Sequence, residues 1–189
     1  MRVITGKYRN KILCVPKGKS TRPTTDKIRE SMFDVISSRY FIEDAKILDL
    51  FSGTGSLGIE ALSRGGASAV FVEKNPESVV ITRKNVSCVS EPTEVYNTDW
   101  KVAVRKLEGR KFDLIFIDPP YGLHIEQDVV SEILKKNILS SDGCIVVEHS
   151  ADNKLCFDEN VFSVYIKDYS GTSVTYLSLQ TDCEKEDNI

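Results

Sequence analysis

The sequence predicts an α/β fold, in which a mostly parallel sheet carries helices on both faces and ends in an antiparallel edge hairpin. Two observations lead to this prediction. After residue 42, short β-prone runs alternate with segments of helical periodicity. At the end of the chain, the β-rich runs 161–167 and 173–179 are separated only by a short polar turn. Since no helix fits between these two runs, we expect them to pair antiparallel.

The first forty residues are expected to form a small extension before the sheet. Residues 2–5 and 11–15 are β-prone runs around a turn that contains glycine, which predicts a hairpin. A helix should follow, capped by Thr24 or Thr25. Its apolar residues recur at helical spacing and are Ile28, Met32, Val35 and Ile36.

The following region should supply the sheet and its helices. Strands are expected at 46–50, 68–73, 93–97, 112–118 and 143–148, and helices near 56–64, 76–88, 99–107 and 125–137. We therefore divide the chain into an extension, residues 1–40, a main domain, residues 41–181, and an acidic tail, residues 182–189, which we expect to be disordered.

Composition narrows the class of protein. At 189 residues the chain is the size of one domain, and its 41% hydrophobic and 28% charged residues are typical of a soluble globular protein. The sequence opens without the apolar region of a signal peptide, and no apolar run approaches about 18 residues, so we expect neither secretion nor membrane insertion. The five cysteines include no Cys-x-x-Cys pair. This favours reduced thiols in a cytoplasmic protein and gives no support to a metal site.

The net charge of −3 conceals a strong asymmetry. Residues 1–30 contain nine Lys or Arg and two acidic residues, a net charge of +7, whereas the rest of the chain carries 16 basic and 26 acidic residues, a net charge of −10. A charged run is usually a solvated surface. An imbalance of this size nevertheless favours contact with a polyanion, because Lys and Arg neutralise phosphates in nucleic-acid binding.

A glycine-rich loop follows the first strand of the main domain. Gly53, Gly55 and Gly58 fit the pattern Gly-x-Gly-x-x-Gly, and Glu73 ends the next strand. Glycines let the backbone approach a ligand closely, the helix start offers free N–H groups, and the acid can accept from ribose hydroxyls. The pattern is also that of NAD-binding proteins, so an NAD-dependent oxidoreductase has to be considered.

Two details favour S-adenosylmethionine over a dinucleotide. Asp49 at the strand tip would repel a pyrophosphate but attract the ammonium of an amino-acid group. Phe51 and Thr54 suit an uncharged nucleoside better than two phosphates. Farther along, Asp99 could accept from the adenine amine and Trp100 could pack on its ring, although a helix cap and a core residue explain these two positions equally well.

The most informative segment is Asp118-Pro119-Pro120-Tyr121, directly after the apolar run 112–117. The two prolines have no N–H, so this strand end offers carbonyl acceptors and few donors. Pro119 also biases Asp118 toward an extended conformation. Such a corner suits a flat group that donates hydrogens, such as a nucleobase with an exocyclic amine.

Together these motifs resemble the class I amino-methyltransferases, whose fourth motif is Asp/Asn-Pro-Pro-aromatic. Residues 2–9 and 22–30 further resemble the RsmD family, the bacterial 16S rRNA guanine(966)-N2 methyltransferases, and the likeness extends to about Glu148. The resemblance implies a Rossmann-like, seven-stranded sheet with a reversed terminal strand. It also implies methyl transfer from S-adenosylmethionine to the exocyclic N2 of one guanine in small-subunit rRNA.

Site residues follow from the motifs and the resemblance. We expect the cofactor to contact Asp49, Phe51, Gly53, Thr54, Gly55, Glu73, Asp99 and Trp100. The catalytic corner comprises Asp118, Pro119, Pro120 and Tyr121, and RNA contacts are expected at Lys7, Arg9, Arg22, Thr24 and Arg29. Arg29 could equally pair with Asp26 along its helix. We expect the enzyme to be a monomer. Its expected partner is 16S rRNA or the small ribosomal subunit.

Several alternatives stay open. Adenine-N6 DNA methyltransferases and glutamine-N5 protein methyltransferases also use Asn/Asp-Pro-Pro-Tyr. The short basic extension leaves little room for a DNA-recognition domain, and glutamine enzymes more often carry Asn at the first position. A non-catalytic RNA-binding assembly factor on the same fold is a third alternative, against which the intact Asp49, Glu73 and Asp118 argue. The NAD-dependent oxidoreductase comes last, because no hydride-transfer partner follows the glycine loop.

Overall fold

The computed structural model describes residues 1–16, 23–120 and 122–180, with the backbone alone for 23–25. In this part of the chain, seven strands form one sheet in the order β3-β2-β1-β4-β5-β7-β6. The strands are β1 (Lys46–Asp49), β2 (Ser68–Glu73), β3 (Thr93–Asn97), β4 (Phe112–Ile117), β5 (Leu139–Ser150), β6 (Phe162–Tyr169) and β7 (Thr172–Leu179). The helices are α1 (Pro23–Arg39), α2 (Ser56–Ser63), α3 (Pro76–Val86), α4 (Trp100–Lys106) and α5 (Glu126–Lys135).

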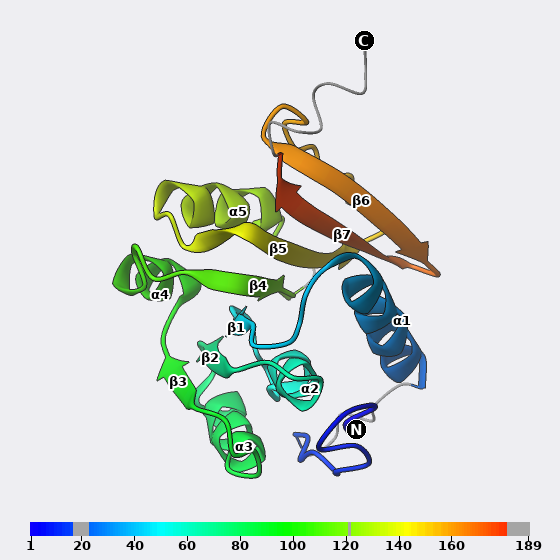
Figure 1. Ribbon diagram of the computed structural model, residues 1–189, viewed down its shortest axis with the longest axis vertical. Coiled ribbons are helices and arrows are strands. Elements are labelled where there is room, and N and C mark those ends of the chain that lie inside the picture. Colours follow the sequence, from blue (N-terminus) through cyan, green and yellow to red (C-terminus); the bar gives the residue numbers. More distant parts are fainter. Residues whose placement is uncertain (17–22, 121, 181–189) are drawn as a thin grey trace.

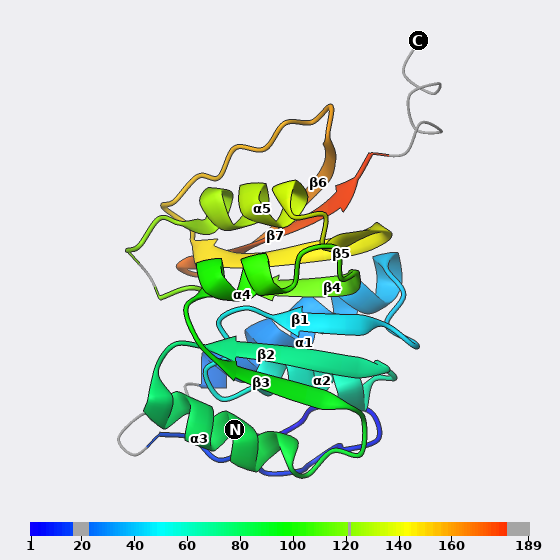
Figure 2. The same cartoon turned by 90° about the vertical axis from the view of Figure 1, so that its left-hand side faces the viewer.

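The sheet is parallel from β3 to β5 and antiparallel where β7 joins β5 and β6 joins β7. Helical crossovers connect the parallel strands, as parallel pairing requires. The last two strands are joined by a tight turn instead, which confirms the predicted terminal hairpin. Figure 2 shows the strands stacked edge to edge, with the hairpin at one end of the sheet and β3 at the other.

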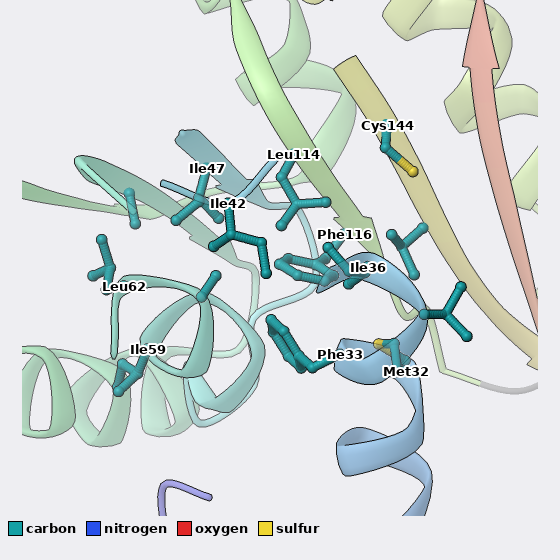
Figure 3. Close-up of a cluster of buried hydrophobic side chains, with 14 of the residues drawn as sticks. Met32, Phe33, Ile36, Ile42, Ile47, Ile59, Leu62, Leu114, Phe116 and Cys144 are labelled. Carbon is teal, nitrogen blue, oxygen red and sulfur yellow. The ribbon is translucent and has the colours of Figure 1, made fainter. Parts of the chain in front are cut away.

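Two hydrophobic clusters cover the two faces of the sheet. Successive residues of a strand point to opposite faces, so Ile47 belongs to one cluster and Leu48 to the other. Helices α1 and α2 pack on the first face, and α4 and α5 on the second (Figure 1). Figure 3 shows Phe33 of α1 directed toward Phe116 of β4, and their ring centroids lie 5.7 Å apart. The fold is therefore a three-layer α/β sandwich, as the sequence predicts.

The amino-terminal residues are held firmly against this core. An antiparallel bridge between Arg2 and Ile12 confirms the predicted hairpin. The carboxylate of Glu60 on α2 is fully buried and accepts from the backbone N–H groups of Ile4 and Thr5 at 2.7 and 3.0 Å. Val3, Leu13 and the apolar face of α1 join the same cluster as the sheet. The predicted boundary between residues 40 and 41 is therefore no break in the hydrophobic core.

Two local predictions were wrong. Helix α1 begins at Pro23, so Thr24 and Thr25 lie in its first turn and not at its cap. Proline is well suited to this position because the first helical N–H has no partner within the helix. Strand β5 begins at Leu139 and not near 143, since Leu139 is buried and pairs with Phe112. Among the described residues, no helix combines the length and apolarity needed to cross a bilayer.

Candidate active site

A cavity of about 610 Å³ opens at the carboxyl ends of the parallel strands. Strand order reverses between β1 and β4, with β2 and β3 on one side and β5 on the other. In open α/β sheets, ligands bind in the crevice at this reversal. The described lining comprises Leu50, Phe51, Gly53, Glu73, Lys74, Asn75, Ser78, Thr98, Asp99, Trp100, Asp118, Pro119, Pro120, Leu123, Ile125 and Glu148.

The Glu73 carboxylate is fixed at the end of β2 by two backbone donors. The N–H of Gly53 donates to its Oε2 at 2.9 Å, and the N–H of Asn75 donates to its Oε1 at 2.7 Å. Each carboxylate oxygen can accept more than one hydrogen bond. The side chain is therefore oriented in advance and can still accept from the hydroxyls of a ribose in the cavity.

The three glycines of the loop have different functions. Gly53 lines the cavity with φ +53, and a Cβ there would meet nothing nearer than 4.0 Å, so its surroundings are open to a ligand. A Cβ on Gly58 would lie 2.4 Å from the buried ring of Phe71. Gly55, with φ +80, also approaches Phe71 and precedes α2. The first glycine thus faces the cavity, and the other two allow the helix to pack on the strand.

Asp49 lies beneath the loop and does not belong to the described lining of the cavity. Its side chain is 2% exposed and accepts from the N–H of Gly58 at 3.2 Å. Burial, with a smaller contribution from the negative charge of Glu73, raises the pKa of Asp49 to about 7. This position supports a role of Asp49 in holding the glycine loop. It does not favour the predicted contact with an ammonium group.

Asp99 and Trp100 combine the two roles that the sequence left open. Asp99 caps α4 by accepting from the N–H of Lys101 at 3.0 Å, and its Oδ2 lies 3.2 Å from Lys74 Nζ. Trp100 is 6% exposed and packs in the second hydrophobic cluster. Both residues also line the cavity, on the side of Glu73. Structural and ligand-facing functions therefore coexist at this edge.

The predicted catalytic corner lies across the cavity from β2. Asp118, Pro119 and Pro120 follow β4 and line the cavity, with Pro119 buried and Asp118 half-buried. Loss of solvation, followed by the negative charges of Glu148 and Asp49, raises the pKa of Asp118 well above its usual value. Perturbed carboxyl groups of this kind cluster at functional sites.

Most of the predicted cofactor residues converge on the cavity, but three do not. Phe51, Gly53, Glu73, Asp99 and Trp100 line it, whereas Asp49, Thr54 and Gly55 are absent from its described lining. The Thr54 carbonyl instead accepts from Asn85 Nδ2 at 2.8 Å, so this residue braces the loop from behind. Tyr121, Arg22 and the Thr24 side chain lie outside the described residues.

The described lining also contains residues that were not predicted from the sequence, namely Lys74, Asn75, Ser78, Thr98, Glu148 and several apolar residues. A signal for Glu148 was present in the sequence. It lies near the end of a predicted strand, as Glu73 and Asp118 do, and parallel strands bring such ends to one edge.

The predicted RNA contacts differ in their surroundings. Arg9 is exposed and lines a smaller cavity between the hairpin and α1. Lys7 is 57% exposed but forms an ion pair with Glu91 at 2.7 Å. Arg29 is 3% exposed, lies 3.3 Å from Asp26 and donates to the carbonyl of Arg2 at 2.6 Å. The structure thus places Arg29 in the alternative ion pair, and its burial does not favour contact with RNA.

The donor and acceptor groups of the cavity fit S-adenosylmethionine. Glu73 is positioned for a ribose, Asp99 and Trp100 lie beside it, and the open backbone at Gly53 leaves room for close approach. The Asp118 corner faces the same space and suits an amine that receives a methyl group. The fold and this cavity define a class I S-adenosylmethionine-dependent methyltransferase.

The chain belongs to the RsmD family. The family model described as "Conserved hypothetical protein 95" matches residues 1–178. YlbH of Bacillus subtilis (strain 168) is 36% identical over 159 residues, which are 82% of this chain and 85% of that protein. Ribosomal RNA small subunit methyltransferase D of Haemophilus influenzae is 32% identical over 164 residues, which are 85% and 84% of the two chains. The solved structure of yhhF from Escherichia coli has a TM-score of 0.83 and 29% identity and covers 95% of this chain and 99% of that one.

Proposed function

We propose that this protein transfers a methyl group from S-adenosylmethionine to the exocyclic N2 of a guanine in 16S rRNA, at the position corresponding to 966. The observation that carries the proposal is the convergence of Glu73 and the Asp118-Pro119 corner in one cavity. The name of the Haemophilus influenzae relative supports a small-subunit rRNA substrate. The family resemblance supports guanine N2.

The chemistry of guanine N2 defines what the enzyme must supply. The N2 lone pair is delocalised into the ring, so the amine is a weak nucleophile, and alignment for in-line attack is the main source of acceleration. S-adenosylmethionine supplies a methyl group bonded to a positively charged sulfur. The new N–C bond forms as the C–S bond breaks, which leaves S-adenosylhomocysteine and a protonated amine.

The protein's own groups position the amine. The Asp118 carboxylate and the Pro119 carbonyl accept the two N2 hydrogens and turn the lone pair toward the methyl group. After transfer the amine is acidic, so its excess proton leaves to Asp118 or to water. Tyr121 stacks on the base, a contact worth about 1–3 kcal/mol. The target guanine must be unstacked to enter the cavity.

The substrate is held outside the cavity by the basic extension. Arg9, Arg22, Lys7 and Thr24 are the proposed contacts to the RNA backbone, because phosphate contacts give affinity and register without reading the sequence. Arg29 is not among them, because its side chain is buried and donates to the carbonyl of Arg2 within the extension.

Methylation of naked 16S rRNA and of 30S subunits, both from cells that lack the enzyme, tests this function. Labelled S-adenosylmethionine, nucleoside analysis and mapping of the modified base should yield N2-methylguanine at one position. N6-methyladenine in DNA or N5-methylglutamine in protein would instead establish one of the alternative activities. Binding of S-adenosylmethionine without transfer to any of these substrates would favour a non-catalytic assembly factor.

A further inference from the structure

A second acid, Glu148, lies directly beside the catalytic corner. Strands β4 and β5 are parallel neighbours in the sheet (Figure 2). The last pair in their register is Ile117 with Val147. Asp118 follows Ile117 at the end of β4, and Glu148 follows Val147 in β5, so the two acids lie on adjacent strands at the same level. Both side chains line the 610 Å³ cavity, and both residues are half-buried.

Each ionised carboxyl group has two acceptor oxygens, each with more than one acceptor site, so two such groups side by side can accept several hydrogen bonds from a ligand. The charge of Glu148 contributes to the raised pKa of Asp118, as does that of Asp49 beneath. The Asp118–Glu148 edge therefore favours a ligand that presents several hydrogen-bond donors side by side.

The edge of guanine that carries N2 has this pattern. Its N1–H and its N2 amine are neighbouring donors, so a carboxylate beside each can accept. Adenine has an unprotonated acceptor nitrogen next to its amine, and that nitrogen would face a carboxylate lone pair. A glutamine amide likewise places its carbonyl acceptor beside its amine. Among the three candidate substrates, guanine alone offers a donor to each acid.

We propose that Glu148 is the residue that selects guanine, by accepting a hydrogen bond from N1–H while Asp118 and the Pro119 carbonyl hold N2. This inference rests on the proposed function and deepens it. Recognition of the target then uses two strand ends of the rigid sheet, which hold their side chains more precisely than a loop would. The same contact orients the ring so that N2 points toward the methyl group.

The test compares two target bases in otherwise identical 16S rRNA, prepared by splint ligation with guanine or 2-aminopurine at the mapped position. 2-Aminopurine keeps the amine but has no hydrogen on N1. Wild-type enzyme should methylate it with a kcat/KM about 10- to 100-fold lower, the effect expected when a hydrogen bond to a charged group is lost. Equal rates on both RNAs with wild-type enzyme would overturn the proposal, and this arm needs no variant.

The second arm uses Glu148→Gln, whose amide can donate to an unprotonated N1. It should lower kcat/KM for guanine about 10- to 100-fold and reduce or reverse the preference over 2-aminopurine, with S-adenosylmethionine affinity measured by calorimetry unchanged. The kcat/KM ratio of guanine to 2-aminopurine is compared between wild-type enzyme and Glu148→Gln. 2-Aminopurine also lacks O6, but that effect enters both ratios and cancels when one is divided by the other. Asp142→Asn is the matched control, because Asp142 is an exposed acid toward the other end of β5.

The outcomes separate the two proposals. If wild-type enzyme makes no N2-methylguanine in rRNA or subunits, the proposed function itself fails. If wild-type enzyme makes that product but Glu148→Gln keeps the wild-type preference, or loses cofactor binding in step with activity, only the assignment of Glu148 fails. Glu148→Asp retains the charge and should keep the preference for guanine.

Discussion

Three carboxyl groups at the ends of neighbouring strands have distinct environments, and these environments assign their roles. Glu73 is fixed by two backbone donors and faces the cavity. Asp49 is buried beneath the glycine loop, where the N–H of Gly58 holds it. Asp118 lines the cavity with a raised pKa. The same functional group thus occurs as an oriented acceptor in the cavity, as a buried brace of the glycine loop and as a cavity acid with a raised pKa.

The first prediction at the residue scale concerns Asp118. Asp118→Asn retains one acceptor oxygen but loses the negative charge and the capacity to take up a proton. We expect the single-turnover methylation rate to fall about 10²-fold, as when a preorganised polar contact is removed from an active site. Affinity for S-adenosylmethionine should change little by calorimetry. Near-wild-type turnover in a folded, cofactor-binding variant would contradict the role of Asp118.

The second residue-scale prediction concerns Asp49 and pH. Its pKa in the folded protein is about 7, whereas an unfolded aspartate titrates near about 3.9. The folded state therefore binds this proton more tightly, so the stabilisation is complete below the unfolded pKa and is lost as pH rises through about 7. The shift of roughly three units corresponds to about 4 kcal/mol.

Asp49→Asn keeps the acceptor for the Gly58 N–H and removes the titration. Urea unfolding of the ligand-free proteins at a series of pH values should show the variant gaining in relative stability as pH rises from about 4 to about 8, by up to about 4 kcal/mol. Asp118 also titrates with a raised pKa, to which the negative charge of Asp49 contributes, so the difference between the two proteins also contains a smaller change from Asp118. Parallel pH profiles of the two proteins would contradict the assignment.

At the scale of elements, the close approach of α2 to β2 positions the glycine loop. Gly58 is the contact point, since a Cβ there would lie 2.4 Å from the fully buried Phe71 ring. Gly58→Ala should lower the free energy of unfolding by about 1–3 kcal/mol through overpacking. Adding Phe71→Leu should recover part of this loss in a double-mutant cycle, because the smaller side chain gives the new methyl group room. Additive losses would show that the two elements do not meet in this way.

The sequence predicts elements well where the pattern is local. The alternation of β-prone runs with helix-periodic segments predicted the strands of the sheet. The acidic residues at strand ends predicted that Glu73 and Asp118 would line the cavity. Contacts that span many residues left no local signal. The Glu60 carboxylate binds the backbone of Ile4 from 56 positions away, and the burial of Arg29 depends on a carbonyl 27 positions away.

The start of β5 and the position of Asp49 show the same limit. The residues that follow Leu139 are polar, so the pattern gave no sign that the strand begins there, and only its pairing with Phe112 reveals it. Asp49 ends a strand as Glu73 does, but the glycine loop folds over it. Strand-end position predicts that an acid reaches the cavity edge. It does not predict whether a loop will cover that acid.

At the scale of the whole molecule, the basic extension is partly neutralised by the acidic body on which it packs. Lys7 pairs with Glu91, and the buried Glu60 pairs with Arg64 at 2.9 Å beside the hairpin. The extension is fixed to α2 by the N–H groups of Ile4 and Thr5, which donate to Glu60, and to α3 by the N–H of Cys14, which donates to Asn85 Oδ1 at 2.8 Å. The positive charges that remain exposed, such as Arg9, are therefore held in a fixed position, from which we propose that they contact the RNA.

This arrangement predicts a graded salt dependence of RNA binding. Each phosphate neutralised on a single strand contributes about 0.7 to the slope of log K against log salt concentration. Arg9→Ala should therefore weaken binding of a labelled rRNA fragment and lower that slope by about 0.7–1. Lys7→Ala should have a smaller effect, because the Lys7 ammonium already lies 2.7 Å from Glu91. Fluorescence anisotropy over a series of KCl concentrations gives the slopes, with Lys46→Ala as control because Lys46 is an exposed lysine of β1, outside the basic extension. Equal slopes for wild-type protein and Arg9→Ala would show that the hairpin does not contact the phosphate backbone, and the RNA would then have to bind elsewhere on the protein.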